Sequence, residues 1–339
     1  MFKKIKDYIL DTIKEEYKFL IFTALLLIVL NIPLNYYIVM GGGISDASSR
    51  IEVEGKKKSK GSFNISYVTQ IDANLLFYGI SYLIPTWERE DANSYKYTST
   101  EKMEDVQFRS DLDLLTANGT ATYWAYTLAH KKVVEKSSKL YVILTDPEEF
   151  ETPLQVGDQI LGMDDQFYDR VEDYSAYLQT KNKGDKVVVK IKRKKKELEV
   201  DAPVYEYEDN KLLGIGLQYV REYETDPQVE IQFNRRESGP SGGLITTLEI
   251  YNQLTKKDLT KGYTIAGTGT IEEDGSIGEI GGIEHKLLGA FSAKADVFLS
   301  PGGDNYKDAI KYAKKKNLKI QIIKVDTIQD AIEKLEGLD

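Results

Sequence analysis

The chain contains no cysteine and only two histidines among its 339 residues. Without cysteine it cannot form a disulfide, use a thiol nucleophile or hold a metal through thiolate ligands. With so few histidines, the imidazole base that commonly activates a serine is almost absent as well. A nucleophilic serine in this chain would therefore need another base, and lysine is the residue type best suited to that role.

The chain also lacks an excess of positive charge. It has 45 lysines and arginines against 54 aspartates and glutamates, a formal net charge of −9. A nucleic-acid-binding surface is basic, so the composition argues against nucleic acid as a partner. The one dense basic run, Lys190–Lys196, follows alternating valines. We interpret it as the exposed end of a hairpin, with a lipid-headgroup or phosphate patch as the alternative.

Only one segment is long and apolar enough to cross a membrane. Phe19–Met40 contains no charged residue, and a helix of ~20 residues spans a hydrocarbon core. Asn31 and Pro33 weaken its second half, and several lysines precede it. Lysines are retained on the cytoplasmic side, so residues 1–18 are expected inside and the remainder outside. A cleaved signal peptide is the alternative, but the stretch exceeds the usual h-region and no A-x-A-like site closes it. We therefore predict a transmembrane signal anchor that contacts bilayer lipid through residues 19–40, and a cell-membrane location.

The segment after this stretch is predicted to form a hairpin followed by helices. Ile51–Glu54 and Phe63–Tyr67 alternate in polarity on either side of a Lys/Gly/Ser turn, which is typical of a hairpin. Residues 70–90 and 110–136 have mainly helical patterns, the second with an interruption at Gly119.

From about residue 138 the pattern becomes richer in strands. Leu154–Ile160 reads L-Q-V-G-D-Q-I, a helix is predicted over Val171–Gln179, and Gly184–Ile191 places a second Gly-Asp turn before alternating valines. This combination resembles a PDZ domain of the bacterial protease-associated type. The resemblance implies a strand edge and an adjoining helix, between which a peptide adds as an extra strand. A β-rich spacer without a ligand is the alternative interpretation.

A serine in a Gly/Pro-rich turn lies between a predicted strand and a predicted helix. Glu237–Leu244 reads E-S-G-P-S-G-G-L, the alternating strand Val229–Phe233 precedes it, and apolar residues recur at helical spacing up to Leu254. Ser241 is therefore expected near a helix N-terminus, where unpaired backbone N–H groups can hold an oxyanion. Taken alone, the string fits an ordinary helix start equally well.

A second motif supplies a partner for this serine. Gly281–Lys286 opens another predicted helix, and Lys286 falls at the rim of its apolar face. A lysine there is partly desolvated, which disfavours the ammonium form and lowers its pKa from ~10.4. Thr268, in an intervening strand, can hydrogen-bond the lysine, although a strand residue with no such role is the alternative. His285 points about 100° away from the lysine and is expected to be a solvated neighbour.

Together these motifs resemble a known family. The string G-P-S-G-G, the strand T-G-T-I and the string G-G-I-x-x-K-L-L are similar to the proteolytic domain of Lon proteases, over about Leu212 to Leu338. The order of apolar anchor, PDZ-like domain and Lon-like domain resembles the PDZ-containing, membrane-anchored Lon-like serine proteases of Gram-positive bacteria.

The resemblance implies roles for five residues. Ser241 would be the nucleophile, Lys286 the general base and Thr268 the residue that supports the lysine. Gly239 and Gly242 would form the turn that holds the oxyanion. No metal or organic cofactor is implied.

Two positions depart from the family pattern. Ser238 stands where many ATP-dependent Lon enzymes have an acidic residue, and Gly242 stands where alanine is common. The chain also lacks the string G-x-x-x-x-G-K-[ST] of a P-loop. A protease without ATP-driven unfolding would cut peptides or flexible segments.

We therefore predict an α/β (α+β) chain that is an ATP-independent, membrane-anchored serine endopeptidase with a Ser–Lys dyad. Its substrates would be extracytoplasmic peptides or membrane-associated proteins. The alternative is a catalytically silent PDZ adaptor that binds protein tails; the intact pair Ser241 and Lys286 favours the enzyme. The predicted regions are a cytoplasmic N-terminus (1–18), a transmembrane anchor (19–40), an extracytoplasmic hairpin and helical region (41–137), a PDZ-like domain (138–203) and a Lon-type proteolytic domain (204–339).

Overall fold

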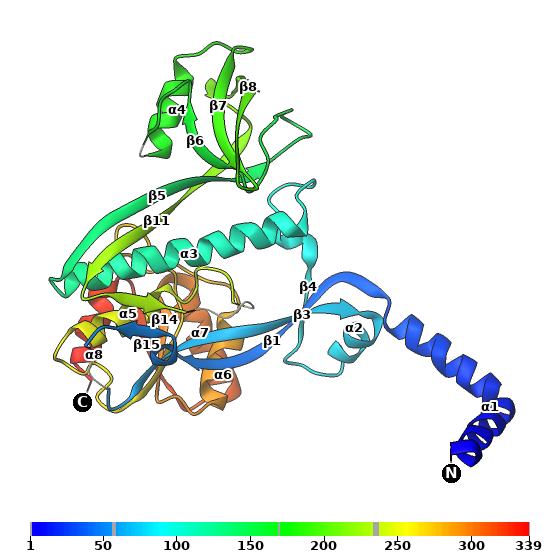
Figure 1. Cartoon of the computed structure of the whole chain (residues 1–339). Coiled ribbons are helices and arrows are strands. Elements are labelled where there is room, and N and C mark those ends of the chain that lie inside the picture. The colour runs from blue at the N-terminus through cyan, green and yellow to red at the C-terminus, as the bar shows by residue number, and fades with distance from the viewer. Residues whose placement is uncertain (1, 56–58, 169, 233–236, 339) are drawn as a thin grey trace. The chain divides into compact units, whose positions relative to one another are not determined.

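The structure is a computed structural model that describes residues 2–55, 59–168, 170–232 and 237–338 (Figure 1). Its internal contacts divide the chain into two compact units: Met1–Gly41 with Thr69–Tyr95, and Gly42–Val68 with Lys96–Asp339. We call them the smaller and the larger unit. Two strands, β1 (Pro33–Asp46) and β3 (Ser62–Asn74), have residues in both.

Besides its helices, the smaller unit contains the N-terminal part of β1 and the C-terminal part of β3. Within it, β1 pairs antiparallel with β4, with Tyr36 opposite Asp91. The side chain of Asn74 caps α2 by accepting a hydrogen bond from the Phe77 N–H at 2.8 Å. The remaining elements of this unit are α1 (Phe2–Leu30), α2 (Leu75–Ser81), β4 (Glu88–Asp91) and the short helix η2 (Ala92–Tyr95).

The prediction of a transmembrane anchor over residues 19–40 is wrong. Among the described residues, no helix combines the length and the apolar character needed to cross a bilayer. Helix α1 ends at Leu30, and the second half of the apolar stretch belongs to strand β1, which begins at Pro33. The residue before a proline is biased away from helical geometry, which explains why the helix stops there. The predicted cell-membrane location and bilayer contact, which depended on this span, stay predictions.

The larger unit is built on a mixed sheet. Strand β13 (Thr264–Gly267) pairs parallel with β3 on one side and with β14 (Val297–Pro301) on the other, and β14 pairs parallel with β15 (Gln321–Val325). Short, apolar strands of this kind are typical of a sheet covered on both faces.

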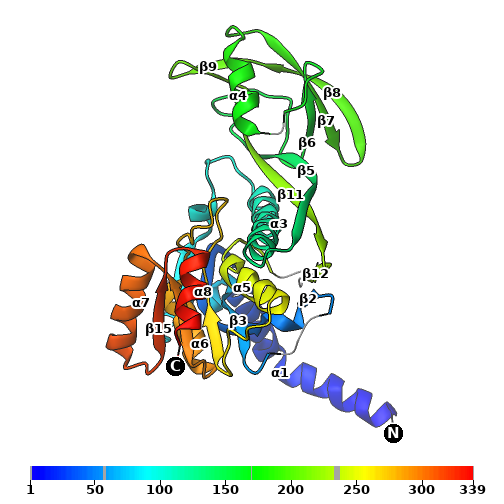
Figure 2. The same cartoon turned by 90° about the vertical axis from the view of Figure 1, so that its left-hand side faces the viewer.

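Alternate residues of these strands enter two different cores. Ile265 and Leu299 belong to the core that includes helix α5, whereas Ala266 and Phe298 belong to the core that includes α6. This alternation places the helices on opposite faces of the sheet (Figure 2). The covering helices are α5 (Gly243–Leu254) and α8 (Ile328–Glu336) on the first face, and α6 (Ile283–Ser292) and α7 (Gly303–Lys316) on the second.

The predicted hairpin between Ile51–Glu54 and Phe63–Tyr67 is wrong, although both segments are strands. Strand β2 (Ile51–Val53) pairs antiparallel with β12 (Val229–Ile231), whereas β3 pairs with β13. The partners in these two pairings are about 180 and about 200 positions apart in the chain, so local alternation could show the strands but not their partners. The last residue of the predicted strand Val229–Phe233 lies outside the described residues. The short helix η1 (Ala47–Ser49) precedes β2.

Residues 70–90 also differ from their predicted helical pattern, because they contain the end of β3, helix α2 and the start of β4. The second predicted helical segment, 110–136, is confirmed only as far as Leu128, the end of the continuous helix α3 (Met103–Leu128); residues 132–136 belong instead to the strand Lys132–Thr145. Gly119 does not interrupt the helix. A Cβ at Gly119 would lie 2.6 Å from the carbonyl oxygen of Arg221, so glycine is required for the close approach of a neighbouring strand.

The second sheet of the larger unit has five strands in the order β11-β5-β6-β7-β8. The predicted helix Val171–Gln179 is confirmed as α4. The basic run is confirmed as the end of a hairpin, because Lys194 and Lys195 form the turn between β7 and β8. The strands are β5 (Lys132–Thr145), β6 (Gln159–Met163), β7 (Lys186–Arg193), β8 (Lys196–Pro203) and β11 (Ile215–Asp226), with the small pair β9 (Tyr205–Tyr207) and β10 (Asn210–Leu212) between β8 and β11.

The first predicted Gly-Asp turn is held by a buried ion pair. Asp158 is 1% exposed, and its carboxylate accepts hydrogen bonds from Arg193 Nε at 2.7 Å and Arg193 Nη2 at 2.6 Å. It also accepts the Gln155 N–H at 2.9 Å. A buried carboxylate needs such partners, so this aspartate is explained by the stability of the turn.

Candidate active site

Ser241 lies in the loop that leads into helix α5, two residues before the helix begins at Gly243. The loop turns through Gly239, whose φ of +83° favours glycine. The Gly243 N–H donates to the Pro240 carbonyl at 3.1 Å, which closes the turn around the serine. Ser241 is partly exposed and lies near a helix N-terminus, the position that the sequence predicts.

Lys286 lies one turn into helix α6 and is 4% exposed. It is therefore buried more deeply than a position at the rim of an apolar face suggests. Burial lowers its pKa from 10.5 to about 8, because the ammonium form loses its hydration. No carboxylate in the described part of the chain compensates for that loss, and desolvation is the cause of the shift.

Thr268 joins the lysine to the serine loop. Lys286 Nζ donates to Thr268 Oγ1 at 3.2 Å, and the same hydroxyl donates to the Ser241 carbonyl oxygen at 3.0 Å. The Gly269 N–H donates to that carbonyl as well, at 2.8 Å. Thr268 is fully buried. The structure thus brings the three predicted residues together, with the threonine hydroxyl between the amine and the serine backbone.

The hydroxyl of Ser241 makes no hydrogen bond to Lys286 within the described part of the chain. The contact between the two residues runs through Thr268 and the Ser241 carbonyl. Catalytic hydrogen bonds are often long or poorly aligned without substrate.

The two predicted turn glycines differ in their backbone partners. The Gly239 N–H donates to the Ser110 carbonyl of helix α3 at 2.9 Å, so it is already engaged. The N–H groups of Ser241 and Gly242 have no acceptor among the residues that the structure describes. Gly242 is the N-cap of α5. The backbone donors open to an anion next to the serine are therefore those of Ser241 and Gly242.

Several residues that shape this loop were missed from the sequence. A Cβ on Gly243 would lie 2.7 Å from Ile271 Cγ2 and 2.9 Å from Ile271 N, so this position admits glycine alone without rearrangement. Ahead of the serine, Glu237 forms an ion pair with Arg50. Only the close approach of Ile271 had a local signal in the sequence, because Gly243 is the third glycine of the motif around Ser241. Nothing local indicated Arg50 or Ser110, because both come from distant parts of the chain.

His285 corrects one expectation. It is 5% exposed, so it is a buried residue of α6 and not a solvated neighbour of Lys286.

Among the described residues, no three histidine, cysteine, aspartate or glutamate side chains gather in a way that would hold a metal ion.

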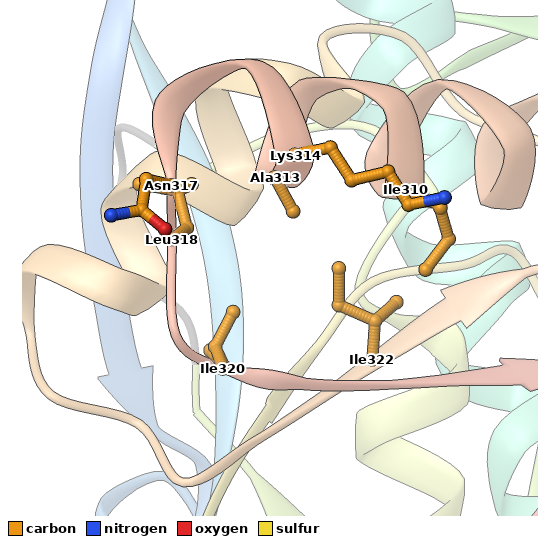
Figure 3. Close-up of a pocket in the computed structure, with 7 residues that line it drawn as sticks. All are labelled: Ile310, Ala313, Lys314, Asn317, Leu318, Ile320 and Ile322. Atoms are coloured by element: carbon orange, nitrogen blue, oxygen red, sulfur yellow. The ribbon is translucent and has the colours of Figure 1, made fainter.

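A shallow groove lies elsewhere, between α7 and β15. It has a volume of about 260 Å³, and Figure 3 shows its lining side chains converging from the helix and the strand. None of them belongs to the serine and lysine site. The lining residues are Ile310, Ala313, Lys314, Asn317, Leu318, Ile320 and Ile322.

Comparison with known proteins finds two families in the chain. Residues 129–204 match the PDZ domain, and residues 235–336 match the Lon protease (S16) C-terminal proteolytic domain. Among solved structures, the PDZ domain of an SdrC-like protein from Listeria monocytogenes is 23% identical; the match covers 23% of this chain and 85% of that chain, with a TM-score of 0.21. No curated protein matches. Ser241, Thr268 and Lys286 all lie within the Lon-type match.

Proposed function

We propose, from the premise that this chain is a PDZ-containing Lon-like serine protease, that Ser241 and Lys286 form its catalytic dyad. The observation that carries the proposal is a lysine that is buried without a counter-ion among the described residues and is hydrogen-bonded through Thr268 to the backbone of the serine. An uncompensated buried lysine is costly for folding, and such residues cluster at functional sites.

The lysine has the acidity that a general base requires. With a pKa of about 8, about one lysine in ten is neutral at pH 7, and most are neutral at pH 9. A base whose pKa lies near the working pH balances the fraction that is neutral against its strength as a proton acceptor. Lys286 meets this condition through burial alone.

The oxyanion is assigned to the backbone at the start of α5. The N–H groups of Ser241 and Gly242 have no acceptor within the described residues, and they precede the positive end of the helix dipole. A donor of this kind contributes on the order of 3–4 kcal/mol to the transition state of acyl transfer. Gly239 would join them only after its N–H leaves the Ser110 carbonyl.

Acyl transfer then proceeds in two halves. Neutral Lys286 takes the proton of Ser241 Oγ as that oxygen attacks the carbonyl carbon of a peptide bond, and the backbone N–H groups hold the oxyanion. The lysine next gives its proton to the leaving amine, and an acyl-enzyme remains. A water molecule passes a proton to Lys286, attacks the acyl carbon and releases the new carboxylate. The lysine finally returns the proton to Ser241.

The proposed substrates are flexible protein segments, cut without ATP. The sequence has no P-loop string, so the chain carries no recognisable means of driving substrate unfolding. Residues 129–204 match the PDZ domain, a fold in which an extended peptide binds by strand addition between a sheet edge and a helix. We propose that this domain binds substrate tails and raises their concentration near Ser241.

The test is a cleavage assay on the full chain with an unstructured protein such as casein, without nucleotide, and with mass identification of the products. Ser241→Ala and Lys286→Ala are each expected to reduce cleavage to background. The matched controls are Ser292→Ala and Lys311→Ala, which remove an exposed serine and an exposed lysine from neighbouring helices. Full activity in Lys286→Ala would refute the dyad. No cleavage by the folded wild-type chain would favour a silent PDZ adaptor.

A further inference from the structure

We infer that Ser66 is a positioning residue for Lys286. Its buried hydroxyl accepts a hydrogen bond from the lysine while the lysine carries the proton taken from Ser241. This inference rests on the proposed dyad and adds a third hydroxyl, from the N-terminal part of the chain, to the support of the base.

Ser66 lies beside Thr268 in the sheet. In the strand register Gly267 is opposite Ile65 on β3 and opposite Leu299 on β14. One residue further along, Thr268 is therefore flanked by Ser66 and by Ser300. Neighbouring strands are about 4.8 Å apart, so three hydroxyl side chains form a row across the sheet.

All three hydroxyls point to the face that α6 covers. Phe63 and Ile65 belong to the core on the α5 face, so Ser66 between Ile65 and Tyr67 points the other way. Val68, two residues on and on the same face as Ser66, faces the start of α6: a Cβ on Gly282 would lie 3.1 Å from Val68 Cγ1. Ser66 therefore lies on the same strand face as Val68, two residues before it, and Val68 contacts the start of α6.

The direction of α6 brings Lys286 to the level of this row. Gly282, at the start of the helix, is level with Val68, and Lys286 follows one turn later with its N–H bonded to the Gly282 carbonyl. Lys286 meets Thr268, and the later residue Ala290 shares a core with Ala266. The helix therefore runs opposite to β13. A step of one turn along α6 matches a step of two residues back along the strands, from Val68 to Ser66.

Ser66 is the member of the row whose hydroxyl has no partner. It is 1% exposed, and its Oγ makes no hydrogen bond within the described part of the chain. Thr268 Oγ1 has two partners, and Ser300 Oγ donates to the Pro301 carbonyl at 3.1 Å. A buried hydroxyl without a partner costs free energy, so each such group needs an explanation. A partner that is present only when Lys286 is protonated supplies one.

The protonated lysine has a hydrogen to donate that the neutral lysine lacks. Neutral Lys286 has two N–H groups and a lone pair that must face the Ser241 hydroxyl to act as a base. The ammonium has three N–H donors. Thr268 accepts one at 3.2 Å, and the oxygen of Ser241 or of the leaving group accepts another. Ser66 is placed to accept the third.

Few charged groups compete for this role. Helix α6 packs against β13, β14 and α7, and it also contacts β1 at Gly43 and β3 at Val68. Strands β13 and β14 carry no titratable side chain, and the parts of β1 and β3 in the larger unit carry Asp46 and Tyr67. Beside the lysine on α6 are Glu284 and His285, and Tyr312 lies on the buried face of α7. None of these groups contributes to the lowered pKa of Lys286, which burial alone produces. Hydroxyl groups are therefore what remains to stabilise the ammonium.

The test compares Ser66→Ala, which removes only the oxygen, with the shape-matched pair Ser66→Thr and Ser66→Val. Loss of the acceptor is expected to lower kcat about tenfold with KM unchanged. A tenfold effect corresponds to about 1.4 kcal/mol of lost ammonium stabilisation. This loss lowers the pKa of Lys286, so the acid limb of the pH–rate profile should move about one pH unit lower. Ser66→Thr keeps the hydroxyl and is expected to retain the wild-type profile, while Ser66→Val behaves like Ser66→Ala. Ser138→Ala removes another buried hydroxyl without a partner among the described residues, on β5, and is the control that leaves the profile unchanged.

The outcomes separate this inference from the proposed function. If Lys286→Ala is inactive but Ser66→Ala keeps the wild-type kcat and pH profile, the role of Ser66 is refuted and the dyad stands. If Lys286→Ala remains active, the dyad itself is refuted. A fall in kcat that Ser66→Thr does not restore, with no shift of the acid limb, would show a purely structural role and also overturn the inference.

Discussion

Replacing the buried lysine with an apolar residue should stabilise the protein while abolishing its activity. Lys286 is 4% exposed, and its pKa in the folded chain is about 8, against an ordinary value of 10.5. The gap corresponds to about 3 kcal/mol, at 1.36 kcal/mol for each pH unit. This is the cost of keeping the lysine charged in the folded state at neutral pH. Methionine at position 286 has a similar length and avoids the cost.

The pH dependence of this effect has a definite sign. Below pH 8 the lysine is charged in both the folded and the unfolded chain, so the folded state bears the full penalty. Between pH 8 and 10.5 the unfolded chain binds more protons than the folded one, and stability rises with pH. Above 10.5 the lysine is neutral in both states and the penalty is gone. The advantage of Lys286→Met should therefore be about 3 kcal/mol at pH 7 and vanish above pH 10.5.

Urea unfolding of the full chain measures this difference. The chain has two tryptophans, and in a Trp87→Phe background the fluorescence reports on Trp124, whose Nε1 donates to the Glu272 carbonyl in the larger unit at 3.2 Å. The control is Lys311→Met, which changes an exposed lysine on α7 and should alter stability little. Equal or lower stability of Lys286→Met at pH 7, or a gain that does not shrink at high pH, would refute the burial argument.

Three further predictions follow from the site. In wild-type protein, kcat should rise with pH through the pKa of Lys286, about 8, because only the neutral amine is a base; a flat profile from pH 6 to 9 would contradict this. Thr268→Val removes the hydroxyl between Lys286 and the Ser241 carbonyl and should lower kcat roughly tenfold or more, whereas Thr268→Ser should retain most activity in the same peptide-cleavage assay. Gly243→Ala should lower the free energy of unfolding by roughly 1–3 kcal/mol, because the added Cβ would lie 2.7 Å from Ile271 Cγ2. Gly242→Ala should change the free energy of unfolding little, because the nearest atom to its Cβ would be 3.4 Å away.

The sequence revealed the parts of the site that are local in the chain. The string around Ser241 and the helix of Lys286 each carry their own signal, a glycine-rich turn before a helix and a lysine at the edge of an apolar face. The structure agrees on both positions and buries the lysine more deeply, at 4% exposure. Thr268 was expected to hydrogen-bond the lysine through its hydroxyl, and the structure has that bond. Its second bond, to the Ser241 carbonyl, was not predicted.

The remaining features depend on pairings between distant residues, which local patterns do not contain. Alternation in Ile51–Glu54 and Phe63–Tyr67 indicated two strands, but their partners are β12 and β13. Ser110 and Ser66 reach the site from elements that precede the PDZ domain. The apolar stretch after Phe19 was read as one helix, yet its second half is a strand whose partners decide its conformation. In each case the tertiary context overrides the local preference.

The central claim is that Lys286 activates Ser241, and the rate at which a phosphorus electrophile modifies this serine tests it most directly. The full chain is incubated with a peptidyl fluorophosphonate, and the adduct is located and timed by mass spectrometry of its peptides. We predict a single adduct on Ser241, formed at a rate that rises with pH through about 8 and falls to background in Lys286→Ala. An adduct on another residue, or labelling of Ser241 at the wild-type rate in Lys286→Ala, would contradict the claim.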